Sequence, residues 1–370
     1  MKKVLILANN DMGLYKFRRE LLETLIQKGY DVVISLPEGE YIPKLKEIGC
    51  TYICSVMERR GKNPFKDLKL LFFYRQLIKN EKPDIVLTYT IKPNIYGGLA
   101  CRWQKVPYMV NITGLGMALE NPGVLQRLTI ILYKAALKKT SVTFFQNEKN
   151  RQFFVNHKIK CGNSILLPGS GVNLNQHLFE TYPEDGTIRI LFIGRVMEAK
   201  GVGELLEAAR KIKKEKENVE FQIVGPYEEN YAEIIGQNEK DGNIKYFGQQ
   251  DDVHAFIKKA HAVIMPSYFE GMSNVLLEAA STGRPVLASA IPGCMETLDE
   301  GISGFSFKVK DVEDMKRIIE RFLSLPYEEK KAMGIRGREK MEREFDRNII
   351  IGKYLEQINV ILNQEERDNG

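Results

Sequence analysis

The chain has 370 residues, 44% of them apolar and 28% charged, a composition typical of globular proteins. This length favours two domains over a single core. No apolar run reaches the roughly 18 residues that a membrane span requires, and Met1, Lys2 and Lys3 lead directly into a strand-like run. We therefore expect neither a signal peptide nor a transmembrane helix.

The charge is divided unevenly along the chain. Residues 1–175 hold 27 Lys and Arg against 13 Asp and Glu (+14), and the remainder holds 27 against 35 (−8), which together give +6. A strongly basic half favours an anionic partner, such as a lipid surface, a nucleic acid or a polyphosphate. Its basic residues are spread over several predicted elements and form no recognised nucleic-acid module, so we expect no nucleic-acid partner.

Short apolar runs alternate with helical patterns through the first half. The run at 3–8 predicts a buried strand, and a helix is expected at 14–28, ended by Gly29. A second helix, which begins with a proline, is expected at 64–80. Further strands are expected at 31–36, 50–55, 84–89, 107–112 and 140–146. Such alternation predicts a parallel sheet covered by helices on both faces.

Residues 164–187 interrupt this alternation. After one strand they are rich in Pro, Gly and polar residues, which is typical of a linker, and the strand-helix rhythm starts again at 188. We predict an α/β protein of two doubly wound domains, at residues 1–173 and 174–344. A C-terminal helix at about 345–363 is expected to pack back on the first domain. In such sheets ligands bind beyond the carboxyl ends of the strands.

Two cations follow the first strand of the second half. Arg195 and Lys200 flank the turn between a strand ending near Gly194 and a helix that opens near 201–203. Cations beside a glycine-rich helix start suit a diphosphate. Neither the P-loop spacing nor G-x-G-x-x-G occurs. The alternative is that both are solvated loop cations.

Two carboxylates lie on either side of a later helix start. Glu270 precedes a helix predicted at 274–282 with Ser273 as its N-cap, and Glu278 lies about one turn inside it. The amides of residues 271–275 are expected to be free and to carry the positive end of the helix dipole. Glu278 has apolar neighbours and needs a polar partner, for which a sugar diol is suitable. Alternatively, both glutamates complement the dipole or lie in water. Together with the two cations, they describe a site for a nucleotide sugar.

The chain resembles the retaining glycosyltransferases of family four, which have the GT-B fold of two Rossmann-like domains facing across a cleft. The resemblance is carried by the E-x7-E pattern of Glu270 and Glu278, by "GRVMEAKG" with Arg195 and Lys200, and by residues 283–305. It extends over 14–33, 82–100, 111–116 and 144–150, hence over nearly the whole chain. The closest branch assembles capsular or lipid-linked saccharides and includes N-acetylhexosaminyltransferases that extend undecaprenyl-diphosphate sugars.

The resemblance implies roles for individual residues. Arg195 and Lys200 would hold the diphosphate, Glu278 the ribose, and Glu270 the transferred hexose. The remaining donor-binding candidates are Gly13, Gly271, Met272, Ser273 and Asn274. Many relatives carry a histidine near residues 88–94, and this chain has none there. The acceptor-side candidates are Thr90, Lys92, Asn94, Thr113 and Gly114.

The expected enzyme is a hexosyltransferase. It would move a hexose or N-acetylhexosamine from a UDP-sugar to a polyprenyl-diphosphate-linked saccharide, with retention and by front-face displacement. No D-x-D motif occurs, so we expect no metal and no cofactor, with the two cations stabilising the leaving UDP. The alternatives are a transferase with a soluble acceptor, an NDP-sugar epimerase and a nucleic-acid-binding protein.

Two basic, apolar segments suggest a membrane surface as a further partner. Residues 123–140 place Leu125, Leu128, Ile131, Leu132 and Ala135 at helical spacing, with the cations Arg127, Lys134, Lys138 and Lys139 around and beyond them. Residues 64–80 add the cations Lys66, Lys69, Arg75 and Lys79 beside the apolar residues Leu71, Phe72 and Phe73. Such helices suit a peripheral enzyme on the cytoplasmic face of an anionic membrane. The alternative is an ordinary helix whose apolar stripe packs on its own sheet.

Overall fold

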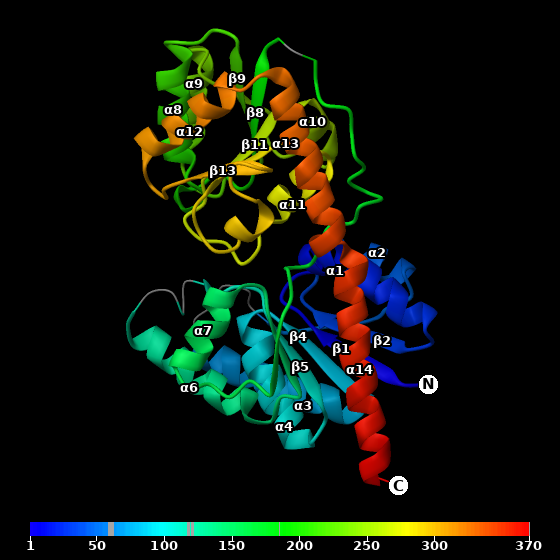
Figure 1. Ribbon diagram of the computed structural model, residues 1–370. Coiled ribbons are helices and arrows are strands. Elements are labelled where there is room, and N and C mark those ends of the chain that lie inside the picture. The colour runs from blue at the N-terminus through cyan, green and yellow to red at the C-terminus, as the bar shows by residue number, and fades with distance from the viewer. Residues whose placement is uncertain (58–62, 117–118, 120–121, 185, 370) are drawn as a thin grey trace. The chain divides into compact units, whose positions relative to one another are not determined.

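The computed structural model describes residues 1–57, 63–116, 119, 122–184 and 186–369, with side chains described as far as residue 364 (Figure 1). The chain forms two compact units. Unit 1 is Met1–Ser170 together with Ile350–Gly370, and unit 2 is Gly171–Ile349. The chain therefore passes between the units twice, and each unit is described by itself below.

Unit 1 is built on a parallel sheet. In the described residues its strands lie in the order β3-β2-β1-β4-β5-β6-β7, and every neighbouring pair is parallel. They are β1 (Lys3–Leu7), β2 (Asp31–Leu36), β3 (Thr51–Cys54), β4 (Ile85–Tyr89), β5 (Tyr108–Ile112), β6 (Val142–Phe145) and β7 (Asn163–Leu166). The inner strands β1, β2, β4, β5 and β6 are mostly apolar and buried because both faces of the sheet are covered.

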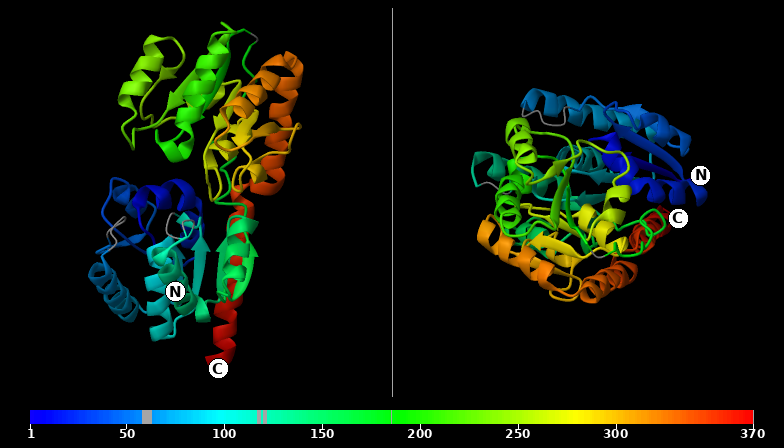
Figure 2. Two further views of the ribbon diagram at one scale, coloured as in Figure 1. Left: turned by 90° about the vertical axis from the view of Figure 1, so that its left-hand side faces the viewer. Right: turned by 90° about the horizontal axis from the view of Figure 1, so that it is seen from above.

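Two layers of helices cover this sheet (Figure 2). The core on one face joins side chains of α1, α2 and α14, and the core on the other joins side chains of α3, α4 and α6. The helices are α1 (Asp11–Gln27), α2 (Ile42–Glu47), α3 (Pro64–Glu81), α4 (Gly98–Gln104), α6 (Val124–Ala136), α7 (Glu148–Asn156) and α14 (Arg347–Asn369). A π-helical turn, η1 (Pro93–Gly97), precedes α4, and a 3₁₀ turn, η2 (Leu137–Lys139), follows α6.

Unit 2 repeats the architecture with a smaller sheet. Its described strands lie in the order β10-β9-β8-β11-β12-β13, again all parallel. They are β8 (Ile188–Ile193), β9 (Val219–Val224), β10 (Lys245–Tyr246), β11 (Ala262–Met265), β12 (Val286–Ser289) and β13 (Gly304–Phe307). The helices are α8 (Val202–Lys213), α9 (Ala232–Lys240), α10 (His254–Lys259), α11 (Asn274–Ser281), α12 (Val312–Ser324) and α13 (Tyr327–Lys340). Short turns are η3 (Glu198–Lys200), η4 (Met295–Thr297) and η5 (Met341–Phe345).

The strand orders locate one switch point in each sheet. In unit 1 the chain proceeds from β1 to β2 on one side and reaches β4 on the other. In unit 2 the same divergence separates β8 from β11. Ligands of open α/β sheets bind where the loops after such strands separate. The loops after β8 and β11 are those that carry the predicted cations and Glu270.

The predicted fold class is confirmed, and most predicted elements lie within a few residues of their observed bounds. Helix α1 begins earlier than predicted, at Asp11, because the side chain of Asn10 accepts a hydrogen bond from Gly13 N (2.6 Å) and caps it. In α14, Ile350, Tyr354 and Ile358 join the core of unit 1.

Candidate active site

The loops after β8 and β11 approach each other closely. Tyr268 N donates to Ala199 O (3.0 Å), and Gly201 lies directly against Pro266. Gly201 has a φ of +68°, and a Cβ there would lie 2.1 Å from Pro266 O. Only glycine fits such a contact without moving the backbone. This contact brings the turn that carries Lys200 beside the loop that carries Glu270.

Lys200 and Glu270 form an ion pair in which Lys200 Nζ donates to Glu270 Oε1. The same carboxylate oxygen accepts a second hydrogen bond from Ser267 Oγ (2.8 Å), and Ser267 is fully buried. Both charged side chains retain partial exposure. A buried hydroxyl and an ammonium thus fix the Glu270 carboxylate at the edge of the sheet, where it remains accessible to a ligand.

Arg195 is the second predicted cation, and it is more exposed. Its Nη1 lies 3.5 Å from Glu228 Oε1, and its side chain is 46% exposed. Glu228 belongs to the loop after β9, which is joined to the β8 loop by the hydrogen bonds Val196 N to Pro226 O (2.8 Å) and Glu228 N to Val196 O (3.1 Å). Each of the two cations therefore already has a carboxylate beside it.

The start of α11 lies where the sequence predicts. Ser273 is the N-cap residue, although its hydroxyl makes no capping hydrogen bond. Ser273 N donates to Gly293 O (2.8 Å), so the expectation that the amides of residues 271–275 are all free is wrong at this position. In the described part of the chain Asn274 Oδ1 is buried without a hydrogen-bond partner. Met272 is buried in the core of unit 2, while Gly271 and Asn274 are half-buried.

Gly293 packs directly against the backbone of this loop, a contact that was not predicted from the sequence. It has a φ of +86°, and a Cβ there would lie 2.7 Å from Glu270 O and 2.8 Å from Gly271 O. Close backbone approach of this kind requires glycine. The loop from Glu270 to Ser273 is therefore held from both sides, by the β8 loop and by Gly293.

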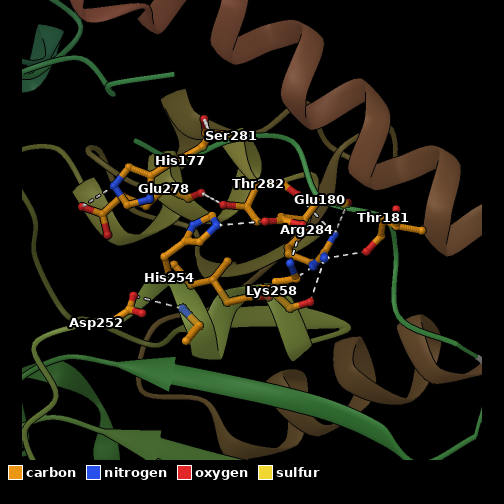
Figure 3. A network of polar contacts seen from close by, with 12 residues as sticks. His177, Glu180, Thr181, Asp252, His254, Lys258, Glu278, Ser281, Thr282 and Arg284 are labelled. Carbon is orange, nitrogen blue, oxygen red and sulfur yellow. Dashed lines mark hydrogen bonds and ion pairs between the residues drawn. The ribbon is translucent and has the colours of Figure 1, made fainter. Parts of the chain in front are cut away.

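Glu278 lies on α11 beside His177 (Figure 3). His177 Nε2 is 4.0 Å from Glu278 Oε1, and the two side chains are 8% and 18% exposed. The backbone of His177 is anchored, since its carbonyl accepts bonds from Ser281 Oγ (2.7 Å) and Arg338 Nη1 (3.0 Å). The sequence assigns no role to His177, which lies in the predicted linker at residues 164–187. In the structure its ring lies beside Glu278, the residue predicted to bind the ribose.

A second histidine extends this network toward a buried arginine (Figure 3). The ring of His254 lies 5.7 Å from that of His177, and its Nε2 is 3.3 Å from Glu180 Oε1. The hydrogen bond from Lys258 lowers the pKa of Glu180. Arg284 is fully buried and donates to the carbonyls of Ile257, Glu180, Thr282, Gly283, Thr181 and Lys258. Burial lowers the pKa of Arg284 to about 10. This part of the network serves stability.

The predicted residues of unit 1 lie at the carboxyl ends of its strands. Gly13 is inside the first turn of α1 instead of in a loop, and its amide is engaged by Asn10. Thr90 follows β4 with a φ of +74°, and its buried Oγ1 has no hydrogen-bond partner among the described residues. Lys92 Nζ forms an ion pair with Asp67 Oδ1 (2.6 Å).

Asn94, also predicted on the acceptor side, is buried. Its side chain accepts from Thr88 Oγ1 (2.8 Å) and donates to Asn111 O (2.9 Å). In this structure the amide group therefore braces β4 against β5. Thr113 and Gly114 directly follow β5 and are half-buried.

Within the described residues, no three or more His, Cys, Asp and Glu side chains gather as a metal-binding group. Within the same ranges, none of the helices combines the length and the apolar character needed to cross a bilayer.

The fold and the Lys200–Glu270 pair define a two-unit α/β protein with a candidate ligand-binding edge, and comparison with known proteins specifies its family. The model of glycosyl transferases group 1 matches residues 176–340, and that of glycosyl transferase 4-like proteins matches residues 3–147. The chain belongs to the family-four glycosyltransferases of GT-B fold and is a glycosyltransferase, as its motifs predict.

Named relatives are similar along nearly the full length. The chain is 27% identical, over 94% of its length and 96% of the relative, to the N,N'-diacetylbacillosaminyl-diphospho-undecaprenol alpha-1,3-N-acetylgalactosaminyltransferase of Campylobacter jejuni. It is 25% identical, over 94% of both chains, to the capsular polysaccharide biosynthesis glycosyltransferase CapM of Staphylococcus aureus. The fold matches that of HepE from Anabaena, solved in complex with UDP, with a TM-score of 0.80, 16% identity and coverage of 97% and 100%.

Proposed function

We propose that this enzyme transfers a hexose or N-acetylhexosamine, with retention, from a UDP-sugar to a polyprenyl-diphosphate-linked saccharide. The observation that carries this proposal is the ion pair of Lys200 and Glu270 at the switch point of unit 2. A cation for a diphosphate and a carboxylate for sugar hydroxyls lie side by side there, as a nucleotide sugar requires.

Each part of the UDP-sugar donor is assigned to residues along this edge. Arg195 and Lys200 bind the diphosphate, Glu270 the hydroxyls of the transferred sugar, and Glu278 those of the ribose. The loop from Gly271 to Asn274 completes the site, and the buried Asn274 Oδ1 supplies an acceptor for a sugar hydroxyl. Helix amides before Leu277 have no partner within α11, which favours the anionic part of the donor.

In the proposed reaction the protein supplies no general base. The acceptor oxygen bonds to the anomeric carbon on the face from which UDP departs, and the leaving phosphate takes the acceptor's proton. Arg195 and Lys200 stabilise the charge that develops on UDP. We expect turnover to be independent of metal: EDTA leaves the rate unchanged, whereas loss of activity that added Mg²⁺ or Mn²⁺ restores would contradict this assignment.

The lipid-linked acceptor is supported by relatives. The similar Campylobacter enzyme is named for a diphospho-undecaprenol acceptor. The other candidate is a soluble acceptor in the same fold. Gly13, Thr90, Lys92, Thr113 and Gly114 remain candidates for substrate contacts in unit 1.

An exposed apolar surface favours a membrane-bound acceptor. Helix α6 packs on unit 1 through Thr129, Ile130, Tyr133 and Ala136, which are buried. The alternative that its stripe packs on the sheet is therefore wrong for Leu125, Leu128 and Ile131, which are exposed. We define the α3/α6 apolar face as the exposed residues Phe65, Leu68, Phe72, Val124, Leu125, Leu128 and Ile131. Leu71, expected to join them, is buried.

Exposed basic residues on and next to the same two helices also favour an anionic membrane surface. Lys69 and Lys79 on α3 are exposed, as are Lys134 on α6 and Lys138 and Lys139 just after it. Both helices attach to the same core, so they belong to one helical layer of unit 1. We propose that this layer rests on the anionic cytoplasmic leaflet, where each nearby cation contributes about 1 kcal/mol.

Product analysis tests the function. The enzyme is incubated with a panel of UDP-sugars and with undecaprenyl-diphosphate-linked mono- and oligosaccharides, and products are identified by mass spectrometry. We expect UDP release coupled to extension of one lipid-linked acceptor. Isomerised UDP-sugar would indicate an epimerase, and extension of only soluble acceptors would move the assignment to a soluble substrate.

A further inference from the structure

Unit 1 contains a buried arginine that no part of the donor site uses. Arg18 lies on α1 and is 6% exposed. Its guanidinium lies over the rings of Tyr89 and Tyr354, with its Cζ 5.1 and 6.0 Å from their centroids. The hydroxyl of Tyr354 donates to Asn111 Oδ1. The faces of the two aromatic rings hold the cation in place, and neither ring carries a negative charge that would neutralise it.

The hydrogen bonding of Arg18 is incomplete. A guanidinium has five N–H donors. Arg18 Nη1 donates to Phe17 O (3.0 Å), but Nε is buried without a partner, and no carboxylate pairs with Arg18 among the described residues. Arg284, the buried arginine of unit 2, shows the contrast, because it donates to six carbonyls (Figure 3). A buried charge without a counter-ion is costly, so an anion bound from solution would stabilise the guanidinium of Arg18.

A pocket leads to Arg18 at the carboxyl ends of β5, β6 and β7. It occupies about 170 Å³, its open mouth included, and its polar lining comes from Arg18, Asn111, Thr113, Gln146, Gly169 and Tyr354. The pocket is a slot too narrow to hold a water molecule in this structure. An anion that reaches Arg18 must therefore part the lining side chains, and Thr113 and Gln146 are only partly buried, so they are able to move.

We infer that this slot is a subsite for a phosphate group, with Arg18 as its binding cation. The inference rests on the proposed function, since the phosphate is that of the diphosphate-linked acceptor. The subsite lies on unit 1 with Thr113, at the strand ends where the acceptor is expected. A guanidinium suits this task because its planar fork binds phosphate oxygens through two parallel hydrogen bonds.

The test uses the full-length enzyme with saturating UDP, which occupies the donor diphosphate site. Binding of inorganic pyrophosphate, of a short polyprenyl diphosphate and of a neutral alkyl glycoside is then measured by calorimetry. We expect wild-type enzyme to bind the two diphosphates and not the glycoside. Arg18→Gln should lower pyrophosphate affinity roughly tenfold or more. Tighter binding of the polyprenyl diphosphate identifies the lipid-linked source, and equal binding identifies a free anion.

Two further variants keep the test decisive. Arg19→Gln removes the same charge one residue away, on an exposed side chain paired with Glu23, and should bind like wild type. Gln146→Glu places a carboxylate in the slot and should abolish the diphosphate effect even if Arg18→Gln fails to fold. Absence of pyrophosphate binding in the wild type, or equal binding in Arg18→Gln or Gln146→Glu, would overturn the inference. Failure of UDP itself to bind would count separately, against the proposed function.

Discussion

Lys200 and Glu270 stand 70 positions apart in the chain and form an ion pair that joins the loop after β8 to the loop after β11. The family resemblance assigns Lys200 to the diphosphate and Glu270 to the hexose. The pair couples these roles, since each side chain holds the other in place before the donor arrives. Substitutions at the two positions should therefore not act independently.

A double-mutant cycle tests this coupling. Lys200→Ala should reduce kcat by about 2–4 kcal/mol of transition-state stabilisation, because the leaving diphosphate loses a cation. Glu270→Gln should also reduce turnover, yet leave UDP affinity unchanged or slightly tighter, since Lys200 loses its internal counter-ion. The double variant should lose less activity than the sum of the single variants. Strict additivity in kcat would show that the pair does not act as a unit.

Arg195 has its own counter-ion in Glu228 (3.5 Å). Arg195→Ala should cost about 2–4 kcal/mol in kcat, as for Lys200. Glu228→Gln should raise the affinity for UDP several-fold at low salt, because Arg195 loses its counter-ion. The gain should shrink as salt screens the charges. Glu233→Gln, an exposed carboxylate on α9, is the matched control and should change nothing. Weaker UDP binding in Glu228→Gln would mean that Glu228 helps to hold Arg195 in its working position.

The ribose assignment predicts a ligand-specific effect. Glu278→Gln should weaken UDP binding and leave binding of 2′,3′-dideoxy-UDP nearly unchanged, because that ligand lacks the diol. His177→Asn should show the same pattern to a smaller degree, since His177 lies beside Glu278. His157→Asn, in unit 1, is the control. Equal loss for both ligands would point to general disruption of α11.

The α3/α6 apolar face predicts association with anionic vesicles that weakens as salt rises. Reversing Lys134, Lys138 and Lys139 to Glu should abolish co-sedimentation and lower activity on a lipid-linked acceptor, with UDP affinity intact. Reversal of Lys214, Lys240 and Lys259, exposed cations of unit 2, should have little effect. A wild-type enzyme that ignores anionic vesicles at low salt would contradict the membrane proposal.

The sequence predicted the fold because continuous apolar runs such as residues 4–7 and 190–193 signal strands buried on both faces. It also predicted where Arg195, Lys200, Glu270 and Glu278 lie relative to strands and helices, since loops after parallel strands meet at one edge.

Contacts between residues that lie far apart in the chain could not be predicted from the sequence. His177 meets Glu278 through a segment whose composition resembles a linker, and the pairing of Lys200 with Glu270 depends on how closely Gly201 approaches Pro266. The exposure of the α6 stripe likewise depends on which face of the helix packs, and both faces of α6 carry apolar residues.

Calorimetric titration of UDP tests whether the edge between β8 and β11 binds the donor. We predict that wild-type enzyme binds one UDP and that Lys200→Ala and Glu278→Gln each weaken this binding roughly tenfold or more. Lys211→Ala, at a partly exposed cation on α8 that pairs with Glu313, should leave UDP binding unchanged. Binding of UDP with wild-type affinity in both Lys200→Ala and Glu278→Gln, or no binding of UDP by the wild type, would contradict this assignment of the donor site.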